Sequence, residues 1–580
     1  CSFLVCEEVE PSGWEETYDN VGLVGIVKAK RNVKTILLKE SDLREDGDPK
    51  KFVVWDEANN RFTYLHAGTG CWEGETFKPK FHDWDYVTAA NLQDKYDWEP
   101  AQGKMVSNPR EGITDMFLPD QSPMPTVEGC EAPTKPALWT EGVEVVLKDG
   151  RTVTCRTVWE HLYDNCKEFT PERAEEITGV KADLIKAAGL EYCQLNEDGY
   201  GDSAINYAVT HEHTGNAMKL IHTFDAFDAI MGRTDTPGGH RGSTRTASVF
   251  ENQHTLLVGQ FLRVGTKNRV SDPEQAARKI GTGKFPLYPN ADATAVYQAM
   301  RTGDPYPIKG GLTQAGGMLN QTNLHLTWEG VKNLDFYTNW NLWHDPISDL
   351  ADLILPEAHW LEVECGRCAQ GSGGYYGAHI KCVEMPGDVK WGIDIVGEWY
   401  KKNGLKFWED REDGGDPWEM GDFLRSKAIA STGMDWQQFR TKFLEEGWFD
   451  ARRYNPEGFG TCRRYETGWM VMPFQGRPGF RTNTSRYEIW STGFENAMRK
   501  QINQLTGEPF GESFALPYYV ENKSSPASDA FRKQQMSNPD NPNRELYADY
   551  TPENYPFILS TGRRIPVYFH SEHRQLPWCR

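Results

Sequence analysis

Residues 334–364, LDFYTNWNLWHDPISDLADLILPEAHWLEVE, decide how the rest of the chain is interpreted. The stretch opens with an apolar and aromatic run, 334–340, which predicts a buried strand. It closes on a second short apolar run, 353–356, which ends in proline. Residues 347–354 mix apolar residues and aspartates at helix-like spacing. This order indicates an α/β fold, in which ligands bind beyond the carboxyl ends of the strands. An ordinary βαβ unit without a ligand has the same spacing, so the stretch alone does not establish a site.

The composition is that of a soluble globular enzyme or binding protein. The chain has 580 residues, 25% of them charged and 38% hydrophobic, which suits about two to four domains. No apolar run is long enough for a membrane-spanning helix. A net charge of −21 disfavours a nucleic-acid-binding surface, because phosphate contacts need clustered Lys and Arg.

The 12 cysteines are scattered and resemble no small disulfide framework. Cys365-Gly366-Arg367-Cys368 is a C-x-x-C sequence without a second pair at zinc-finger spacing. It is therefore a weak signal for a metal or redox site, and two reduced thiols in a loop are the simpler interpretation. The chain begins at Cys1 without a signal segment and ends at Arg580 without a tail, so we expect a fragment of a longer protein.

Hydrophobic periodicity and capping residues predict alternating helices and strands. The expected helices lie at 152–166, 174–178, 181–190, 217–231, 324–332, 391–403 and 435–446. The expected strands lie at 34–38, 52–55, 205–209, 481–490, 555–560 and 565–569, with another running into the glycine-containing loop 312–323. Residues 68–139 form a long insertion rich in Pro, Gly, Asp and Trp, and residues 496–554 are interpreted as a connecting arm.

Ligand-binding residue types gather first in the loop after strand 205–209. His211, His213 and Asn216 stand there ahead of a helix, whose N-terminus favours anionic groups. Two histidines one residue apart suit metal ligation. No third ligand is near, which favours hydrogen-bonded loop histidines instead.

Two further loops carry amide and basic groups. Gln314, Gly316 and Asn320 belong to a loop where glycine admits a ligand and amides can read a base or pterin edge. Without G-x-G-x-x-G or a P-loop lysine, this is weak support for a nucleotide. Residues 561–564, TGRR, and 570–574, HSEHR, could clamp a phosphate or a polar heterocycle, or form a solvated basic patch. The sequence lacks G-x-S-x-G, H-E-x-x-H, kinase and Walker signatures.

Taken together, these segments resemble the molybdopterin oxidoreductases of the dimethyl sulfoxide reductase family, which carry molybdenum or tungsten bis(molybdopterin guanine dinucleotide). The matching segments, in family order, are PERAEEITGV (171–180), THEHTGNAMKLIHTFDAFDAIMGRTDTPGG (210–239), DFYTNWNLWHDPISDLADLILPEAHWLE (335–362) and YPFILSTGRRIPVYFHSEHRQLPW (555–578). SDLREDGDPKKFVVWDE (41–57) and FHSEHRQLPW (569–578) are most similar to the branch containing acetylene hydratase and the catechol dehydroxylases. Residues 363–368 depart from the family's Gly-Thr and Asn-Glu-Gly-Arg pattern, which leaves pterin contacts from that loop unassigned.

The resemblance implies two dinucleotide-binding α/β domains with parallel sheets. Residues 1–245 would form the first, with its N-terminal part missing and the insertion 68–139, and residues 246–545 the second with its arm. Residues 550–580 would begin a C-terminal β-barrel that also binds the molybdopterin dinucleotide. The family's [4Fe-4S] motif and metal-ligating residue would precede Cys1, so no metal ligand or catalytic residue is assigned within the chain.

Loop position and motif match together predict the cofactor contacts. They are His211, His213, Asn216, Gln314, Gly316, Asn320, Asn339, Asp345, Thr561, Gly562, Arg563, His570, Ser571 and Arg574.

The function implied by the resemblance is two-electron redox chemistry at molybdenum or tungsten in an anaerobic oxidoreductase, with reductive dehydroxylation of an aromatic substrate as the leading reaction. The alternatives are a non-redox tungsten hydratase resembling acetylene hydratase, and a non-catalytic scaffold subunit of a redox complex. The expected partners are a small-molecule substrate and an electron-transfer partner such as an iron-sulfur subunit, with neither nucleic acid nor a membrane span. The compartment, cytoplasmic or reached by twin-arginine export, stays open because any signal would precede Cys1.

Overall fold

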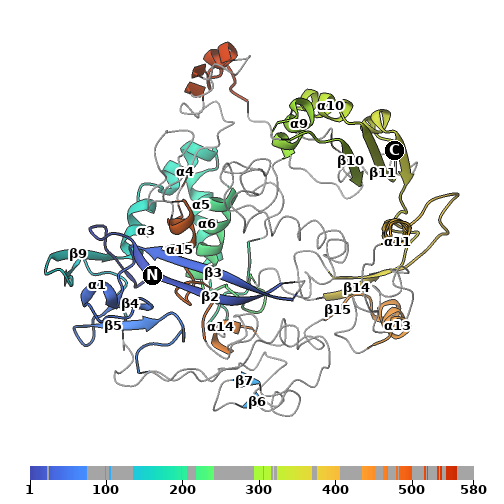
Figure 1. The fold of residues 1–580 in the computed structure, drawn as a ribbon. Helices are drawn as coiled ribbons and strands as arrows, with labels where there is room; N and C mark the ends of the chain where they lie inside the picture. The colour runs from blue at the N-terminus through green and yellow to red at the C-terminus, as the bar shows by residue number, and fades with distance from the viewer. Residues whose placement is uncertain are drawn as a thin grey trace. The chain divides into compact units, whose positions relative to one another are not determined.

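The computed structural model contains two compact units built from both helices and strands (Figure 1). It describes residues 1–22, 25–74, 98–99, 104–105, 135–197, 199–205, 217–240, 293–304, 306–314, 318, 323–368, 375–404, 434–450, 462–467, 478–480, 482–498, 515–517, 519, 532–533, 536–537 and 544–557. The first unit comprises Cys1–Gly242 and Pro456–Ser560, and the second comprises Ser243–Asn455 and Thr561–Arg580. Within the described ranges, no helix combines the length and apolarity needed to cross a membrane.

The first unit contains short antiparallel sheets and several helices. Its strands are β1 (Leu4–Val5), β2 (Ser12–Gly22), β3 (Gly25–Thr35), β4 (Lys51–Asp56), β5 (Arg61–His66), β6 (Trp98–Glu99), β7 (Lys104–Met105), β8 (Val143–Val146) and β9 (Thr152–Thr157). Its helices are α1 (Glu40–Leu43), α3 (Val158–Cys166), α4 (Pro171–Thr178), α5 (Ala182–Tyr192), α6 (Ala217–Ile230), α14 (Arg464–Thr467), α15 (Thr492–Met498) and the 3-10 helix η7 (Arg544–Asp549).

The second unit contains a parallel sheet and a separate antiparallel sheet. Its strands are β10 (Gly310–Gln314), β11 (Phe336–Asn341), β12 (Leu353–Pro356), β13 (Cys365–Cys368), β14 (Tyr375–His379) and β15 (Phe449–Asp450). Its helices are α9 (Ala293–Thr302), α10 (Leu324–Lys332), the 3-10 helix η2 (Pro346–Leu350), α11 (Gly392–Lys402) and α13 (Trp436–Glu446).

The parallel sheet confirms the strand, connection and strand expected within residues 334–364. It has the order β10-β11-β12, and both neighbouring pairs are parallel. Residues 347–354, with their helix-like spacing, divide into the 3-10 helix η2 and strand β12. The turn starts where it does because Asp345 caps it and Pro346 occupies its first position, where no amide hydrogen is needed.

Helices α9 and α10 cover one face of this sheet (Figure 1). Leu326 and Val331 of α10 pack with Tyr337 of β11 and Ile347 of η2 in one buried cluster. The chain enters α10 through Asn323, whose side-chain oxygen accepts a hydrogen bond from the amide of Leu326 at 3.2 Å. Because the three strands are parallel, their carboxyl ends lie at a common edge of the sheet.

Residues 152–166, predicted as one helix, are instead strand β9 followed by helix α3. Val153, Cys155 and Thr157 are buried at every second position, which is the strand period, and β9 pairs antiparallel with β8 and β1. The helix begins after Thr157, whose hydroxyl accepts from the amide of Glu160 at 3.2 Å. The Glu160 carboxylate accepts from the Thr157 amide at 2.7 Å in return. The capping pattern T-x-x-E marks this boundary in the sequence.

Residues 481–490 were predicted as a strand, but the described part, 482–490, consists of turns, bends and irregular backbone. Side chains satisfy the backbone locally: the amide of Thr484 donates to Glu488 at 2.9 Å, and Thr482 Oγ1 donates to the carbonyl of Arg486 at 2.6 Å. Ser485 has a φ of +59°, which an extended strand does not allow. These local bonds replace the ladder of a strand.

The first unit also takes in Pro456–Ser560, most of which was predicted to belong to the second domain and its arm. Ile489, Trp490 and Leu516 are buried in one core cluster with Phe3 and Phe52. The domain boundaries at 245, 545 and 550 otherwise stay predictions.

The outcome for the other predicted helices and strands depends on whether the structure describes the residues concerned. Helices α4, α5, α6, α10, α11 and α13 and strand β4 confirm predicted elements within a few residues, and β3 covers only the start of the predicted strand 34–38. The predicted strands 205–209 and 555–560 lie largely, and 565–569 entirely, outside the described residues, as does most of the insertion 68–139.

Candidate functional site

The carboxyl edge of the parallel sheet carries a polar side chain at each strand end. Gln314 ends β10, Asn341 ends β11, and Glu357 directly follows β12. The backbone amide of Glu357 donates to the carbonyl of Asn341 at 3.1 Å, and Gln314 Nε2 donates to Glu357 Oε2 at 3.3 Å. The three side chains therefore share one edge, which is where open α/β sheets bind ligands.

Glu357 has the most distinctive electrostatics of this edge. Its Oε1 accepts the amide hydrogen of Gly392, at the start of α11, at 2.9 Å. Burial raises the pKa of Glu357 even though the hydrogen bonds from Gly392 and Gln314 oppose the shift. Its carboxyl group consequently takes up a proton more readily than that of an exposed glutamate, so the edge offers both amides and a protonatable carboxyl.

Asp345 ties the loop after β11 back to the strand. Its Oδ1 accepts from Ser348 Oγ at 2.6 Å, from the Ser348 amide at 3.1 Å and from Asn339 Nδ2 at 3.1 Å. Its Oδ2 accepts from Asn341 Nδ2 at 3.2 Å. The carboxylate thus organises the loop, with the strand and the 3-10 turn as its donors.

Asn339, on strand β11, also forms hydrogen bonds with this loop. Its side chain is fully buried and Nδ2 also lies 3.1 Å from Ser348 Oγ. Among the described residues, its Oδ1 has no hydrogen-bond partner. A buried amide in this position can hold Asp345 and Ser348 in place, whereas contact with an external ligand would require its exposure.

Only three of the predicted cofactor contacts are described, and all three belong to this sheet or its loop: Gln314, Asn339 and Asp345. The others lie outside the described residues and stay predictions, namely His211, His213, Asn216, Gly316, Asn320, Thr561, Gly562, Arg563, His570, Ser571 and Arg574. Sequence reasoning did not select Asn341, Ser348 or Glu357. The pattern D-P-x-S, which forms a capping box here, would have found Ser348, and the first polar residue after β12 would have found Glu357.

Gly392 is required by the close approach of the Trp340 and Glu357 side chains. A Cβ added there would lie 2.0 Å from Trp340 Cζ2 and 2.7 Å from Glu357 Oε2. We expect Gly392→Ala to destabilise the second unit by about 1–3 kcal/mol, because the buried indole has no free space. Gly189→Ala, in the interior of α5 with nothing within 4 Å of its Cβ, should instead stabilise the first unit by about 0.5–1 kcal/mol. Urea unfolding of the two variants checks both signs, and a Gly392→Ala protein as stable as wild type would refute the packing argument.

Cys365 and Cys368 lie on strand β13 rather than in a loop. The two cysteines are thus part of an antiparallel sheet, in which β13 pairs with β14. In the part of the chain that the structure describes, no group of three His, Cys, Asp or Glu side chains is placed to hold a metal.

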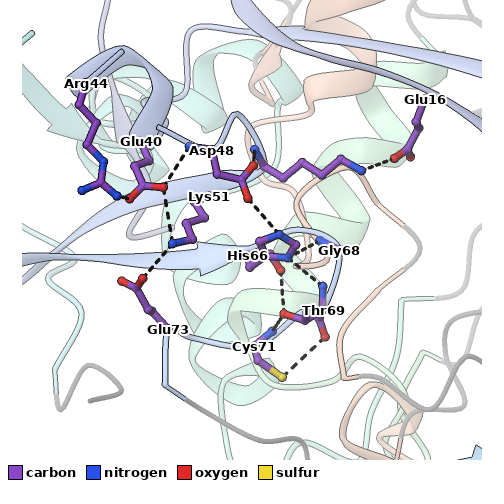
Figure 2. A network of polar contacts seen from close by, with 11 residues as sticks. Glu16, Glu40, Arg44, Asp48, Lys51, His66, Gly68, Thr69, Cys71 and Glu73 are labelled. Carbon is purple, nitrogen blue, oxygen red and sulfur yellow. Dashed lines mark hydrogen bonds and ion pairs between the residues drawn. The ribbon is translucent and has the colours of Figure 1, made fainter. Parts of the chain in front are cut away.

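A network of ionic groups joins α1, β4 and β5 in the first unit (Figure 2). The buried Glu40 carboxylate pairs with Arg44, accepts from the Asp48 amide at 3.0 Å and lies 3.5 Å from Lys51 Nζ. Lys51 Nζ also donates to Glu73 at 2.8 Å. The positive and negative charges of this network offset one another, and its ion pairs hold α1, β4 and β5 together.

His66 belongs to the same network and holds the turn that follows β5 (Figure 2). Its Nδ1 accepts from the amides of Gly68 and Thr69 at 3.1 and 3.2 Å, so Nε2 carries the proton that faces Asp48 Oδ2 at 3.3 Å. Burial lowers the pKa of His66, although Asp48 opposes the shift. The lowered pKa favours the neutral imidazole with its proton on Nε2, so that Nδ1 can accept the two amide hydrogens of the turn.

Helix α6, which follows the predicted loop at 211–216, contains two buried basic groups. Lys219 Nζ donates to the carbonyl of Leu516 at 2.9 Å, and burial lowers the pKa of Lys219 to about 7. His222 Nε2 lies 3.2 Å from the carbonyl of Glu488, and burial together with the charge of Lys219 lowers the pKa of His222 to about 4. These contacts connect α6 to the backbone of Leu516 and Glu488 in the same unit.

His222 makes the stability of the first unit depend on pH. Its pKa rises from about 4 in the folded protein to about 6.5 on unfolding, so its contribution is fully present above pH 6.5 and is lost as pH falls towards 4. Between pH 7.5 and pH 5, we expect this group to reduce the free energy of unfolding by about 2 kcal/mol. Urea unfolding at both pH values should show this loss diminished in His222→Gln and retained in His325→Gln, a control at an exposed histidine. Equal pH dependence of wild type and His222→Gln would contradict it.

Comparison with known proteins gives a consistent set of relatives, although no family model matches the chain. Dopamine dehydroxylase from Eggerthella lenta is 33% identical, over 100% of this chain and 57% of that protein. Acetylene hydratase from Syntrophotalea acetylenica is 22% identical over 72% of this chain and 50% of that protein. The solved acetylene hydratase from Pelobacter acetylenicus, 22% identical, covers 70% of this chain and 49% of that chain with a TM-score of 0.47, too low to establish a shared fold.

A more distant relative is named after dimethyl sulfoxide reductase. This protein of Halobacterium salinarum, described as the catalytic component of a dimethyl sulfoxide reductase, is 26% identical over 37% of this chain and 23% of its own length. The chain spans about half the length of the curated relatives that match most of it.

Proposed function

Because the chain belongs to the molybdopterin oxidoreductases of the dimethyl sulfoxide reductase family, we propose that it is part of an enzyme that reductively dehydroxylates an aromatic substrate at molybdenum or tungsten. The observation that carries the proposal is the 33% identity to a dopamine dehydroxylase along 100% of this chain. Dopamine is a catechol, so the substrate class that we take from this relative is a ring bearing neighbouring hydroxyl groups.

The carboxyl edge of the parallel sheet suits the organic part of bis(molybdopterin guanine dinucleotide). Gln314, Asn341 and Glu357 offer amides and a protonatable carboxyl, which complement the donors and acceptors of a guanine or pterin edge. In this proposal they contact the cofactor, while Asn339 and Asp345 position the loop above them. The predicted contacts at His211, His213, Asn216, Gly316, Asn320, Thr561, Gly562, Arg563, His570, Ser571 and Arg574 are proposed to complete the binding of its two arms.

This chain spans 57% of the length of its dopamine dehydroxylase relative. The metal ligand and a [4Fe-4S] cluster are proposed to belong to the remainder of a longer protein. When bound, the cofactor supplies a metal centre that exchanges two electrons with the substrate. This chain's residues would bind and orient its arms through the hydrogen bonds described above.

The overall reaction replaces an aromatic C–OH bond by C–H. It consumes two electrons and two protons and releases water, so an electron-transfer partner, such as an iron-sulfur subunit, is part of the proposal. A second candidate function, non-redox hydration at tungsten, is favoured by the similarity to acetylene hydratase over 72% of the chain.

One set of measurements on the complete, cofactor-loaded protein tests the proposal. Metal analysis should find molybdenum or tungsten, and fluorescence of the oxidised pterin should find the cofactor in stoichiometric amount. A catechol should then lose a hydroxyl group only when a reduced viologen dye supplies electrons. Hydration of acetylene without any donor would instead favour the hydratase, and protein without metal or pterin would leave a scaffold subunit.

A further inference from the structure

Strands β1 and β9 bring two buried cysteines face to face. The strands pair antiparallel, with Leu4 opposite Thr157 and Val5 opposite Arg156. The next step of the same register places Cys6 opposite Cys155. Both cysteines are 0% exposed, both are free thiols, and both belong to one apolar cluster.

The hydrogen bonds of β1 show which kind of cross-strand pair this is. The Cys6 amide donates to the carbonyl of Ile36 at 3.1 Å, and the Leu4 carbonyl accepts from Leu38 at 2.8 Å. The backbone groups of Leu4 and Cys6 therefore point away from β9, towards segment 36–38. Residues of this kind form non-hydrogen-bonded antiparallel pairs, whose Cα atoms lie about 4.5 Å apart. Disulfides accept Cα separations of about 4.4–6.8 Å, so a bond between these sulfurs fits the strands as they stand.

The surroundings of the pair favour a thiolate on Cys6. The hydrogen bond from the Cys155 thiol lowers the pKa of Cys6 to about 7, although burial opposes the shift, and the same contact raises the pKa of Cys155. Lys39, which is fully buried nearby, is a cation whose charge interacts favourably with Cys6, while Glu8 and Asp42 oppose the thiolate. Cys6 is thus the better nucleophile of the two and Cys155 the better proton donor.

We propose that Cys6 and Cys155 form a redox-active thiol pair, which hydrogen peroxide closes into a reversible disulfide between β1 and β9. A small uncharged oxidant is specified because both sulfurs are buried. The Cys6 thiolate attacks one peroxide oxygen, the O–O bond breaks, and Cys6 becomes a sulfenic acid with release of hydroxide. The Cys155 sulfur then attacks the Cys6 sulfur, its proton leaves with the sulfenic oxygen as water, and the S–S bond forms. In total two thiols lose two electrons and two protons, and the peroxide becomes two water molecules.

Thiol mapping of the whole protein tests the pair directly. Reduced protein is treated with hydrogen peroxide, quenched with catalase, denatured, alkylated and digested for mass spectrometry. We expect a cross-linked peptide joining Cys6 and Cys155, which dithiothreitol removes. The oxidised protein should also melt several degrees higher, because the bond constrains the unfolded chain over a long loop. Cys71→Ser, at another buried cysteine of the same unit, should leave the cross-link unchanged, while Cys6→Ser and Cys155→Ser should each abolish it.

Two results would overturn the proposal. One is full alkylation of Cys6 and Cys155 after the peroxide treatment. The other is sulfinic or sulfonic acid on Cys6 with Cys155 still a free thiol. Because the mapping is read on wild-type protein, it remains decisive even if a serine variant fails to fold. It is also independent of metal, pterin and turnover, so it stands apart from the test of the proposed function.

Discussion

Asp235→Ala should lower the free energy of unfolding of the first unit by about 3–5 kcal/mol, because it removes the carboxylate of a buried ion pair. The Asp235 side chain is 1% exposed and that of Arg464 8% exposed. Asp235 Oδ1 accepts from two guanidinium nitrogens at 2.8 and 3.0 Å, and Oδ2 accepts from the Arg464 amide at 2.6 Å. The alanine variant keeps the Arg464 charge buried but removes this partner, and the attraction that offset its desolvation is lost.

Urea unfolding measures the effect, with two controls on the same unit. Asp235→Asn keeps the side-chain shape and loses the charge, so its stability should fall between those of wild type and Asp235→Ala. Asp149→Ala removes the carboxylate of an exposed pair with Arg151 and should change stability little. If Asp235→Ala were no more harmful than Asp149→Ala, the buried pair would not contribute to the fold as the geometry indicates.

Asp345→Ala should reduce the cofactor content of the complete protein roughly tenfold or more. The substitution removes the acceptor for Asn339, Asn341 and both donors of Ser348, so the loop after β11 loses its connection to the strand. Molybdenum, tungsten and pterin are measured per protein in purified samples. This prediction rests on the proposed site, since loss of the loop matters to cofactor content only if the loop borders the cofactor.

Asp349→Ala is the matched control, because Asp349 is on the same 3-10 turn and its side chain is 67% exposed. It should retain normal cofactor content. Asp345→Asn keeps one acceptor oxygen and should retain part of it. Full metal and pterin content in Asp345→Ala, in protein that melts at a lower temperature, would show that the loop is structural and does not border the cofactor.

The sequence predicts elements well where one local signal dominates. The parallel strands β11 and β12 stand out as short apolar runs, and helix α4 is announced by Thr170, Pro171 and the glycine at 179, which takes the left-handed conformation that ends a helix. Strand β9 is hard to recognise in the sequence because Val153, Val158 and Leu162 also fit helical spacing. The capping box at Thr157 is the local signal that marks where the strand ends and helix α3 begins.

What could not be predicted depends on contacts between residues distant in sequence. Asp235 and Arg464 are 229 residues apart, and nothing in either segment announces the pair. The turns at 482–490 form because side chains such as Glu488 bond the backbone, which apolar spacing does not reveal. At the candidate site, Gln314, Asn339 and Asp345 could be chosen because they follow or belong to recognisable strands. The distinction between Asn339 as a buried support and Asn341 at the edge required the packed structure.

The discontinuity of the first unit sets an order of events during synthesis. Phe3 and Phe52 leave the ribosome early, but Ile489, Trp490 and Leu516, which complete their core, follow only after the whole of segment 243–455. At roughly 5–20 residues per second, this delay is on the order of tens of seconds. For that time the nascent chain exposes an apolar surface that its own later residues will cover, and surfaces of this kind promote aggregation. The second unit's sheet, built from residues 310–356, faces no such wait.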